Sequence, residues 1–196
     1  MIDTKEIIIQ RSFVLFLRKG YKEVSVNEIH KECGVSKGAF YHHFVSKDAL
    51  YKEVLNRFFF SYFRRDDADY SDTDLDIKLN NFAKTFIGPY QEISKLLNDK
   101  QISAYFRFLF QAANTFEDIR QKVNRHFYTK GYYLYQILEQ AKHKKEIKQS
   151  INSKVIARQM LSTIIGVTIL EGIYDISDVQ DRLKEIIEEN YNLLKQ

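Results

Sequence analysis

Apolar residues recur at intervals of three and four through most of this 196-residue chain, which is the spacing of one face of an α-helix. In the first segment this stripe consists of Ile9, Phe13, Phe16 and Leu17. The pattern predicts a helix over about residues 3–19, closed by Gly20. One proline and seven glycines interrupt the pattern rarely, so the sequence predicts an all-α fold.

The next two segments are short and carry clear start and stop signals. "SVNE" at 25–28 is a capping box, in which the Ser25 hydroxyl accepts from the Glu28 backbone and the Glu28 carboxylate returns to the Ser25 backbone. Gly34 ends this helix because glycine tolerates a positive φ. Ser36 then caps a third helix, which we expect from Lys37 to about Phe44.

The remaining helices are longer. Ser46 caps one over about 47–65, and further patterns predict helices over 75–97, 102–113, 116–144, 153–174 and 178–194. Gly88–Pro89 is expected to kink or break the second of these. Thr115 is the expected cap of 116–144, and "SDVQ" the expected capping box of the last helix.

The acidic stretch "DDADYSDTD" at 66–74 separates two of these helices and is interpreted as a solvated loop. A calcium loop is the alternative, but that pattern requires a central glycine and a distal glutamate at fixed offsets. Neither residue is present in the stretch.

Charge is distributed unevenly along the chain. Residues 1–47 hold eight Lys or Arg and five Asp or Glu, whereas the other 149 residues hold 22 and 21. The basic excess therefore lies beside the short helices, which points to nucleic acid as a partner.

Targeting signals are not evident. The lone Cys33 cannot form an internal disulfide, and the N-terminus lacks the basic start of a signal peptide. No apolar run approaches the roughly 20 residues that span a bilayer. We therefore expect a cytoplasmic protein with no membrane partner.

Two short helices joined by a glycine-containing turn form the helix-turn-helix pattern. Within "CGVSKGAFYHHF" at 33–44, small residues at 38 and 39 permit close approach to a DNA backbone and to the crossing helix. The serines and Lys47 lie at helix N-termini, where phosphate oxygens are favoured. The expected DNA-binding residues are Ser25, Ser36, Lys37, Gly38, Tyr41, His42, His43 and Lys47.

Residues 20–51, "GYKEVSVNEIHKECGVSKGAFYHHFVSKDALY", resemble the DNA-binding segment of the TetR (tetracycline repressor-like) family of bacterial transcription regulators. The resemblance implies a three-helix DNA-binding domain over 1–47 and a larger helical domain over 48–196 that binds an effector and dimerises. It also implies a homodimer that leaves a palindromic DNA operator when a small molecule binds. By position, Ser25, Tyr41 and Lys47 would mainly hold phosphates. His30 departs from the alanine common in the family, and we expect it to change only local packing.

Aromatic residues beyond residue 51 exceed what a small helical core needs. Each alone is better explained as core, but together they suggest a cavity for an apolar or aromatic effector. The residues expected to line it are Phe58, Tyr62, Phe86, Tyr90, Phe106, Phe110, Tyr128 and Tyr132.

The last two helices are the expected homodimer seam. Residues 164–170 are apolar or small nearly all round, and Gly166 and Gly172 allow close helix approach. The final helix adds an apolar stripe that includes Ile186, Ile187 and Tyr191. Two helices from each subunit would form a four-helix interface.

Other site types are disfavoured. A metal site from His30, Cys33, His42 and His43 is conceivable, but the position of Cys33 suits a small buried residue, so no metal or cofactor is expected. No nucleophile with a base and no carboxylate pair is evident, which argues against an enzyme.

The sequence thus favours a ligand-responsive DNA-binding transcription regulator, most simply a repressor. One alternative is a DNA-binding protein of the same fold that responds to a partner protein or to nothing. The other is a small helical enzyme or carrier that uses the aromatic cavity.

Overall fold

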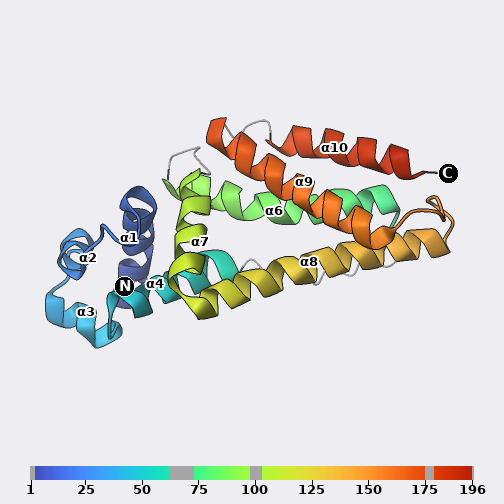
Figure 1. Cartoon of the computed structure of the whole chain (residues 1–196). Helices are drawn as coiled ribbons and strands as arrows, with labels where there is room; N and C mark the ends of the chain where they lie inside the picture. Colours follow the sequence, from blue (N-terminus) through green and yellow to red (C-terminus); the bar gives the residue numbers. More distant parts are fainter. Residues whose placement is uncertain (1–2, 62–72, 98–102, 175–178, 196) are drawn as a thin grey trace. The chain divides into compact units, whose positions relative to one another are not determined.

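The computed structural model describes residues 3–61, 73–97, 103–174 and 179–195, and the regular elements in these ranges are all helices (Figure 1). The expected all-α fold class is confirmed. The elements are α1 (Thr4–Lys19), α2 (Val26–Cys33), α3 (Lys37–His43), α4 (Lys47–Leu55), the π-helix η1 (Asn56–Phe60), α6 (Leu75–Leu97), α7 (Ser103–Thr115), α8 (Glu117–His143), α9 (Ser153–Tyr174) and α10 (Val179–Leu194).

The chain forms two compact units. The first combines Met1–Arg65 with Ala104–Gln121, and the second combines Asp66–Ser103 with Lys122–Gln196. The first unit therefore extends past residue 47 and includes most of α7. The functional division at residue 47 stays a prediction, because packing alone does not define it.

Stacked aromatic rings form the core of the first unit. Phe13 of α1 lies face to face with Phe58, with ring centroids 4.0 Å apart, and Phe16 meets the edge of Tyr51 at 4.8 Å. The Tyr51 hydroxyl donates to the carbonyl oxygen of Phe108 at 3.1 Å, and burial raises its pKa. Because these residues come from α1, α4, η1 and α7, one aromatic core holds all four elements together.

The π-helix was not expected from the sequence, which predicts one continuous α-helix over 47–65. Phe58, Phe59 and Phe60 are consecutive and all buried. In an α-helix, successive side chains are about 100° apart, so three in a row cannot share one face. In the π-helix, Phe58 and Phe59 both pack on Phe13, and Phe60 is buried beside them in the chain.

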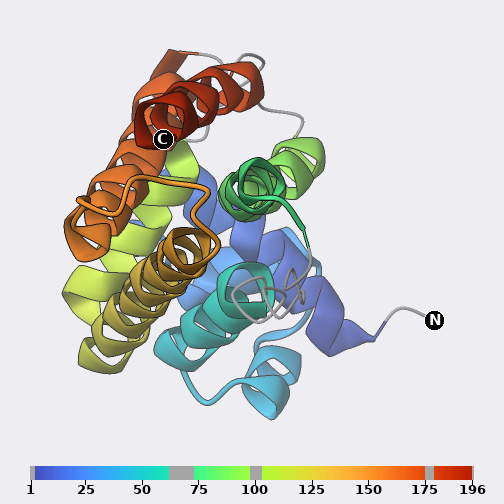
Figure 2. The same cartoon turned by 90° about the vertical axis from the view of Figure 1, so that its right-hand side faces the viewer.

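In the second unit α10 packs on α6 and α9, and residues of α8 complete the shared core (Figure 2). Aliphatic side chains dominate this core: Leu79, Leu134, Leu138, Met160, Ile164, Leu183 and Ile187 are all buried. Ile164 and Thr168 of the expected dimer seam are thus already covered within one subunit.

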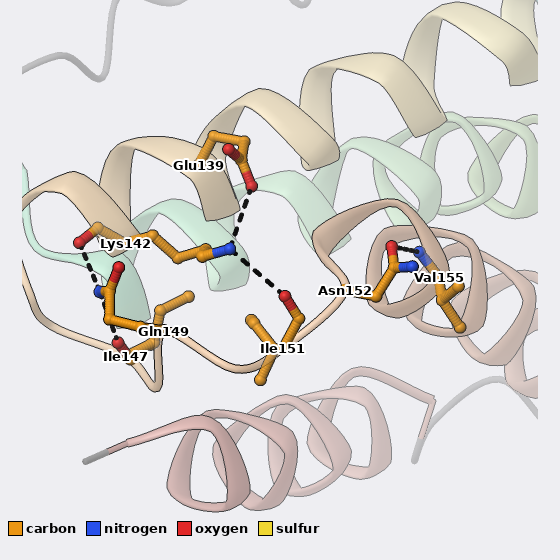
Figure 3. A network of polar contacts seen from close by, with 7 residues as sticks. All are labelled: Glu139, Lys142, Ile147, Gln149, Ile151, Asn152 and Val155. Carbon is orange, nitrogen blue, oxygen red and sulfur yellow. Dashed lines mark hydrogen bonds and ion pairs between the residues drawn. The ribbon is translucent and has the colours of Figure 1, made fainter.

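A hydrogen-bonded turn joins α8 to α9 (Figure 3). Lys142 Nζ donates to the carbonyl of Ile151 at 3.3 Å, and Gln149 Nε2 donates to the carbonyl of Lys142 at 2.8 Å. Asn152 caps α9, its Oδ1 accepting from the Val155 backbone at 3.3 Å. The turn is therefore closed by Lys142 from the end of α8 and by Gln149 and Asn152 of the connecting segment.

Two expected helix signals are wrong. Thr115 ends α7 and donates its hydroxyl to the Gln111 carbonyl four residues back, so it does not cap α8. The α6 helix continues through Gly88–Pro89 without a break, and a kink at this point stays a prediction. The first two residues of the "SDVQ" box lie outside the described residues. Most of the acidic stretch at 66–74 also lies outside them.

The α9 helix is more apolar than we expected from the sequence. Eighteen of its residues, Ser153–Leu170, have a mean hydropathy of 1.2, enough by length and composition to cross a membrane. The expectation that no stretch approaches this length is wrong, because two charged residues are tolerated in such an average. A third of the stretch is buried, Ile156, Ile165 and Val167 are partly buried against the core, and the exposed apolar side chains are Val155 and Leu170.

Candidate nucleic-acid interface

The capping box at the start of α2 is present. Ser25 Oγ accepts from the Glu28 backbone at 3.2 Å. The Glu28 carboxylate pairs with Lys19 Nζ and also accepts from the Ser25 backbone. The Lys19 ammonium, followed by this backbone contact, lowers the pKa of Glu28. The local sequence therefore fixes where α2 begins.

A sharp turn connects α2 to α3. Gly34 has φ 66° and ψ 29°, the left-handed conformation that side chains other than glycine adopt at a cost. The Val35 backbone returns to the His30 carbonyl at 3.0 Å, closing the end of α2. Ser36 then caps α3 by accepting from the Ala39 backbone at 3.1 Å. The helix-turn-helix geometry thus follows from a few local residues.

The α3 helix has two chemically different faces. Phe40 and, directly after the helix, Phe44 are buried against the unit core. Lys37 and His42 are exposed, and Tyr41 is 47% exposed. An outward tyrosine beside cationic and imidazole groups offers both stacking surface and hydrogen-bond donors to a nucleic acid.

Gly38 has no structural reason to be glycine. A Cβ atom built there would meet only Ser36 Oγ at 3.8 Å, and the residue does not have a positive φ. Gly34 differs, because its φ of +66° strains any replacement. The fold therefore leaves room for a side chain at 38, and the close approach of DNA to this glycine stays a prediction.

The capping serines retain a hydrogen to donate. A serine hydroxyl has one donor and two acceptor lone pairs. Ser25 and Ser36 are exposed and use acceptor capacity on the Glu28 and Ala39 backbones. Their O–H groups can point outward to a phosphate oxygen without losing the caps.

Lys47 and His43 are the least exposed of the expected DNA-binding residues. His43 is half-buried, with its ring 4.9 Å from that of His42. Lys47 Nζ donates to the carbonyl oxygens of Tyr21 and Val24, each at 2.8 Å. Burial lowers the Lys47 pKa, an effect partly opposed by the Asp48 charge.

Sequence reasoning missed the contacts of Tyr21. Its hydroxyl pairs with Asp48 Oδ1, and burial followed by this contact raises its pKa to about 12. Its backbone N–H donates to Gln111 Oε1 at 3.2 Å. The sequence signal for a role of Tyr21 is the "GY" pair that follows the first helix. Nothing in the sequence pattern indicates a residue 90 positions away.

The structure does not gather the eight expected effector residues into one described pocket. Phe58 and Phe106 are buried in the first unit, and Phe110 there is half exposed. Phe86 is buried in the second unit, where Tyr128 and Tyr132 are exposed. Tyr62 and the side chain of Tyr90 lie outside the described residues, so the full pocket stays a prediction.

Tyr128 and Tyr132 do share a cavity. It has a volume of about 380 Å³ and lies between α8 and α9 in the second unit. Aromatic rings and two cations line it: Phe127, Tyr128, Tyr132, Tyr135, Lys154 and Arg158. The sequence identified two of the rings but neither cation.

The residues considered for a metal site do not form one. Cys33 is buried, with Sγ 4.0 Å from the Ile8 carbonyl oxygen, and burial raises the pKa of its thiol. Among the described residues, no three His, Cys, Asp or Glu side chains are placed to hold an ion together.

Comparison with known proteins places this geometry in a family. Residues 8–54 match bacterial regulatory proteins of the tetR family. Residues 8–54 of this chain are therefore a tetR-family segment. The match covers most of α1, all of α2 and α3 and most of α4, which includes each residue of the proposed interface.

Individual tetR-family relatives match over different lengths. The uncharacterized HTH-type transcriptional regulator YuxN of Bacillus subtilis is 46% identical over 65 residues, 33% of this chain and 22% of that protein. The biofilm operon icaADBC HTH-type negative transcriptional regulator IcaR of Staphylococcus aureus (strain Newman) is 26% identical over 114 residues, 58% of this chain and 56% of IcaR. The chain thus matches about a fifth and about half of these two curated relatives.

The likeness in fold extends over the whole chain. A crystal structure of a TetR/AcrR-type transcriptional regulator from Aquifex aeolicus VF5 is 26% identical, covers 97% of this chain and 99% of that one, and has a TM-score of 0.64. The second compact unit therefore also has the helical architecture of a tetR-family protein.

Proposed function

We propose that this protein is a DNA-binding transcription repressor whose α3 enters the major groove. The observation that supports this most directly is the outward face of α3, with Lys37, Gly38, Tyr41 and His42 at the surface while Phe40 anchors the helix. IcaR is named a negative regulator, which favours repression over activation.

The repressor is a homodimer in this proposal. One short recognition helix makes too few contacts for useful affinity, and two placed about 34–36 Å apart read both halves of a palindrome. Support comes from α9, where Leu170 is 60% exposed and Val155 is also exposed on an apolar helix. In the proposed dimer these two side chains would be covered by the second subunit.

A small molecule releases the repressor from DNA in this proposal. The cavity between α8 and α9 falls in the size range of ligand sites, about 300–1,000 Å³. Its aromatic lining suits an aromatic effector, and Lys154 and Arg158 would favour one that carries a negative group. Binding that shifts operator affinity by about 5–150-fold would be typical for such coupling.

Fluorescence anisotropy with labelled duplex DNA tests the proposal. The protein should bind duplex with an affinity that falls steeply as salt rises, because phosphate contacts release counterions. Tyr41→Ala should weaken binding without unfolding the protein, since this ring is half exposed. Absence of salt-sensitive duplex binding by the folded wild-type protein would rule the proposal out.

Effector binding is tested separately by thermal unfolding with a library of aromatic acids and their neutral amides. An acid should raise the melting temperature more than its amide, and Arg158→Gln should remove that preference. Equal shifts for acids and amides, or none, would argue against an anionic effector at this cavity.

A further inference from the structure

The two ends of the helix-turn-helix are tied together by one side chain. The chain enters this motif through residues 20–24 and leaves it at Lys47, the first residue of α4. Lys47 Nζ donates to the carbonyls of Tyr21 and Val24 and lies 4.2 Å from the centroid of the Tyr21 ring. Lys47, at the end of the motif, is therefore hydrogen-bonded to the segment that precedes the motif. These bonds close a loop that contains residues 25–46.

These contacts commit most of the Lys47 ammonium to the fold. An ammonium has three N–H donors, and two of them go to carbonyl oxygens at 2.8 Å. The adjacent Asp48 carboxylate receives the Tyr21 hydroxyl, so the first two residues of α4 both hold Tyr21. A phosphate ligand would instead be exposed and free to extend toward the duplex, as Lys37 is.

A second helix holds the same segment from another direction. Gln111 of α7 accepts from the Tyr21 backbone, and its amide lies so close to Gly20 that a Cβ there would be 3.1 Å from Nε2. Arg107, one turn earlier on α7, donates to the Leu17 carbonyl at 2.6 Å. Residues 17–24 are thus fixed by α4 and α7 together.

We propose that Lys47 and Gln111 are positioning residues, which clasp the 20–24 segment and thereby set the first turn of α2 relative to α3, and that Lys47 is not a phosphate contact. This inference rests on the DNA-binding function proposed above. It departs from what the family resemblance implies for Lys47, and it adds Gln111, which no motif of the family segment includes.

The test compares Lys47→Met with Lys37→Met, which removes an exposed cation from α3. Binding is measured over a salt series on a duplex that the wild-type protein enriches from a random pool. Removing a phosphate contact lowers the slope of log affinity against log salt by about 0.9 per contact. Lys37→Met should lower the slope and leave the melting temperature unchanged. Lys47→Met should keep the slope, bind more weakly at every salt concentration and melt lower by about 4 °C.

Two further variants keep the inference testable if Lys47→Met does not fold. Lys47→Arg retains the charge, and arginine binds phosphate at least as well as lysine, so a phosphate contact would survive. The larger guanidinium would disturb the hydrogen bonds to the Tyr21 and Val24 carbonyls. Lys47→Arg should therefore bind duplex more weakly and melt at a lower temperature. The uncharged change Gln111→Leu should weaken binding and lower the melting temperature with no change of slope.

The inference is overturned if Lys47→Met loses slope at an unchanged melting temperature, if its affinity stays at the wild-type value, or if Lys47→Arg behaves as the wild type does. Failure of the proposed function is distinguishable from these outcomes. In that case the wild-type protein enriches no duplex, while the melting temperatures of the variants still report the clasp.

Discussion

His126 and Lys130 lie one turn apart on α8, where the protein disfavours their charged forms. Burial lowers the pKa of His126 to about 4 and that of Lys130 to about 8. Lys130 Nζ donates to Thr85 Oγ1 at 3.0 Å and lies 5.7 and 5.5 Å from the ring centroids of Phe82 and Phe86. Both groups should make the stability of the second unit depend on pH.

For His126 the sensitive range is acidic. Between pH 6.5 and 4 the unfolded chain binds a proton that the folded protein does not, so stability falls as the pH falls. The histidine should contribute a loss of about 2–3 kcal/mol between pH 7 and 4.5. Urea unfolding of the wild type and of His126→Gln at pH 7 and pH 4.5 measures this loss of stability. The variant should lose less stability than the wild type, and equal losses would contradict the burial of this imidazole.

For Lys130 the sensitive range is alkaline. Above about pH 8 the folded protein releases the Lys130 proton, whereas the unfolded chain retains it to about pH 10.5. Wild-type stability should therefore rise relative to Lys130→Met by up to about 3 kcal/mol over this range. Urea titrations of both proteins from pH 7.5 to 10.5 give the difference between their unfolding free energies. This difference would not change with pH if the Lys130 amine were solvated in the folded protein.

At the scale of single helices, α2 and α3 carry two glycines four residues apart with different roles. Gly34→Ala should cost about 1–2 kcal/mol in unfolding free energy because its φ is positive. Gly38→Ala should leave stability unchanged or slightly higher, since alanine favours helix and the added Cβ meets no clash. Duplex binding should nevertheless fall for Gly38→Ala, measured by anisotropy beside chemical unfolding. Wild-type binding by this variant would remove the argument that DNA approaches residue 38.

Helix beginnings near the interface were predictable because their signals are local. Ser25, Ser36 and Ser46 each accept from a backbone N–H three residues ahead, so four consecutive letters suffice to predict the cap. Gly34 is equally local, because its positive φ ends α2. The outward face of α3 follows from the placement of two apolar residues, Phe40 within the helix and Phe44 directly after it.

Features that depend on distant partners could not be predicted in this way. The π-helix buries three successive phenylalanines, and one of them, Phe59, stacks on Phe108 from α7. Lys47 reads as an exposed residue at a helix start, but its ammonium is engaged by carbonyls 23 and 26 residues earlier. Threonine is a residue type that often caps helices, yet the Thr115 hydroxyl donates to the carbonyl oxygen of Gln111. Periodicity carries no information about such partners.

At the scale of the whole molecule, the proposal requires two copies. Leu170→Glu would place a charge on the exposed apolar surface of α9 and should shift the protein from dimer to monomer in sedimentation velocity. Val45→Glu is the matched control, because Val45 is 84% exposed and lies in the first unit. A wild-type protein that sediments as a monomer, or a Leu170→Glu dimer, would contradict the seam on α9.

The most direct test of a groove-reading α3 is selection of bound duplexes from a random pool by the purified protein. The selected sequences should converge on two inverted half-sites with centres about one helical turn, 10–10.5 base pairs, or a multiple of it apart. Tyr41→Ala should lose this enrichment while remaining folded. A single unrepeated site, or a pool that stays random with folded wild-type protein, would contradict a dimer that reads DNA through α3.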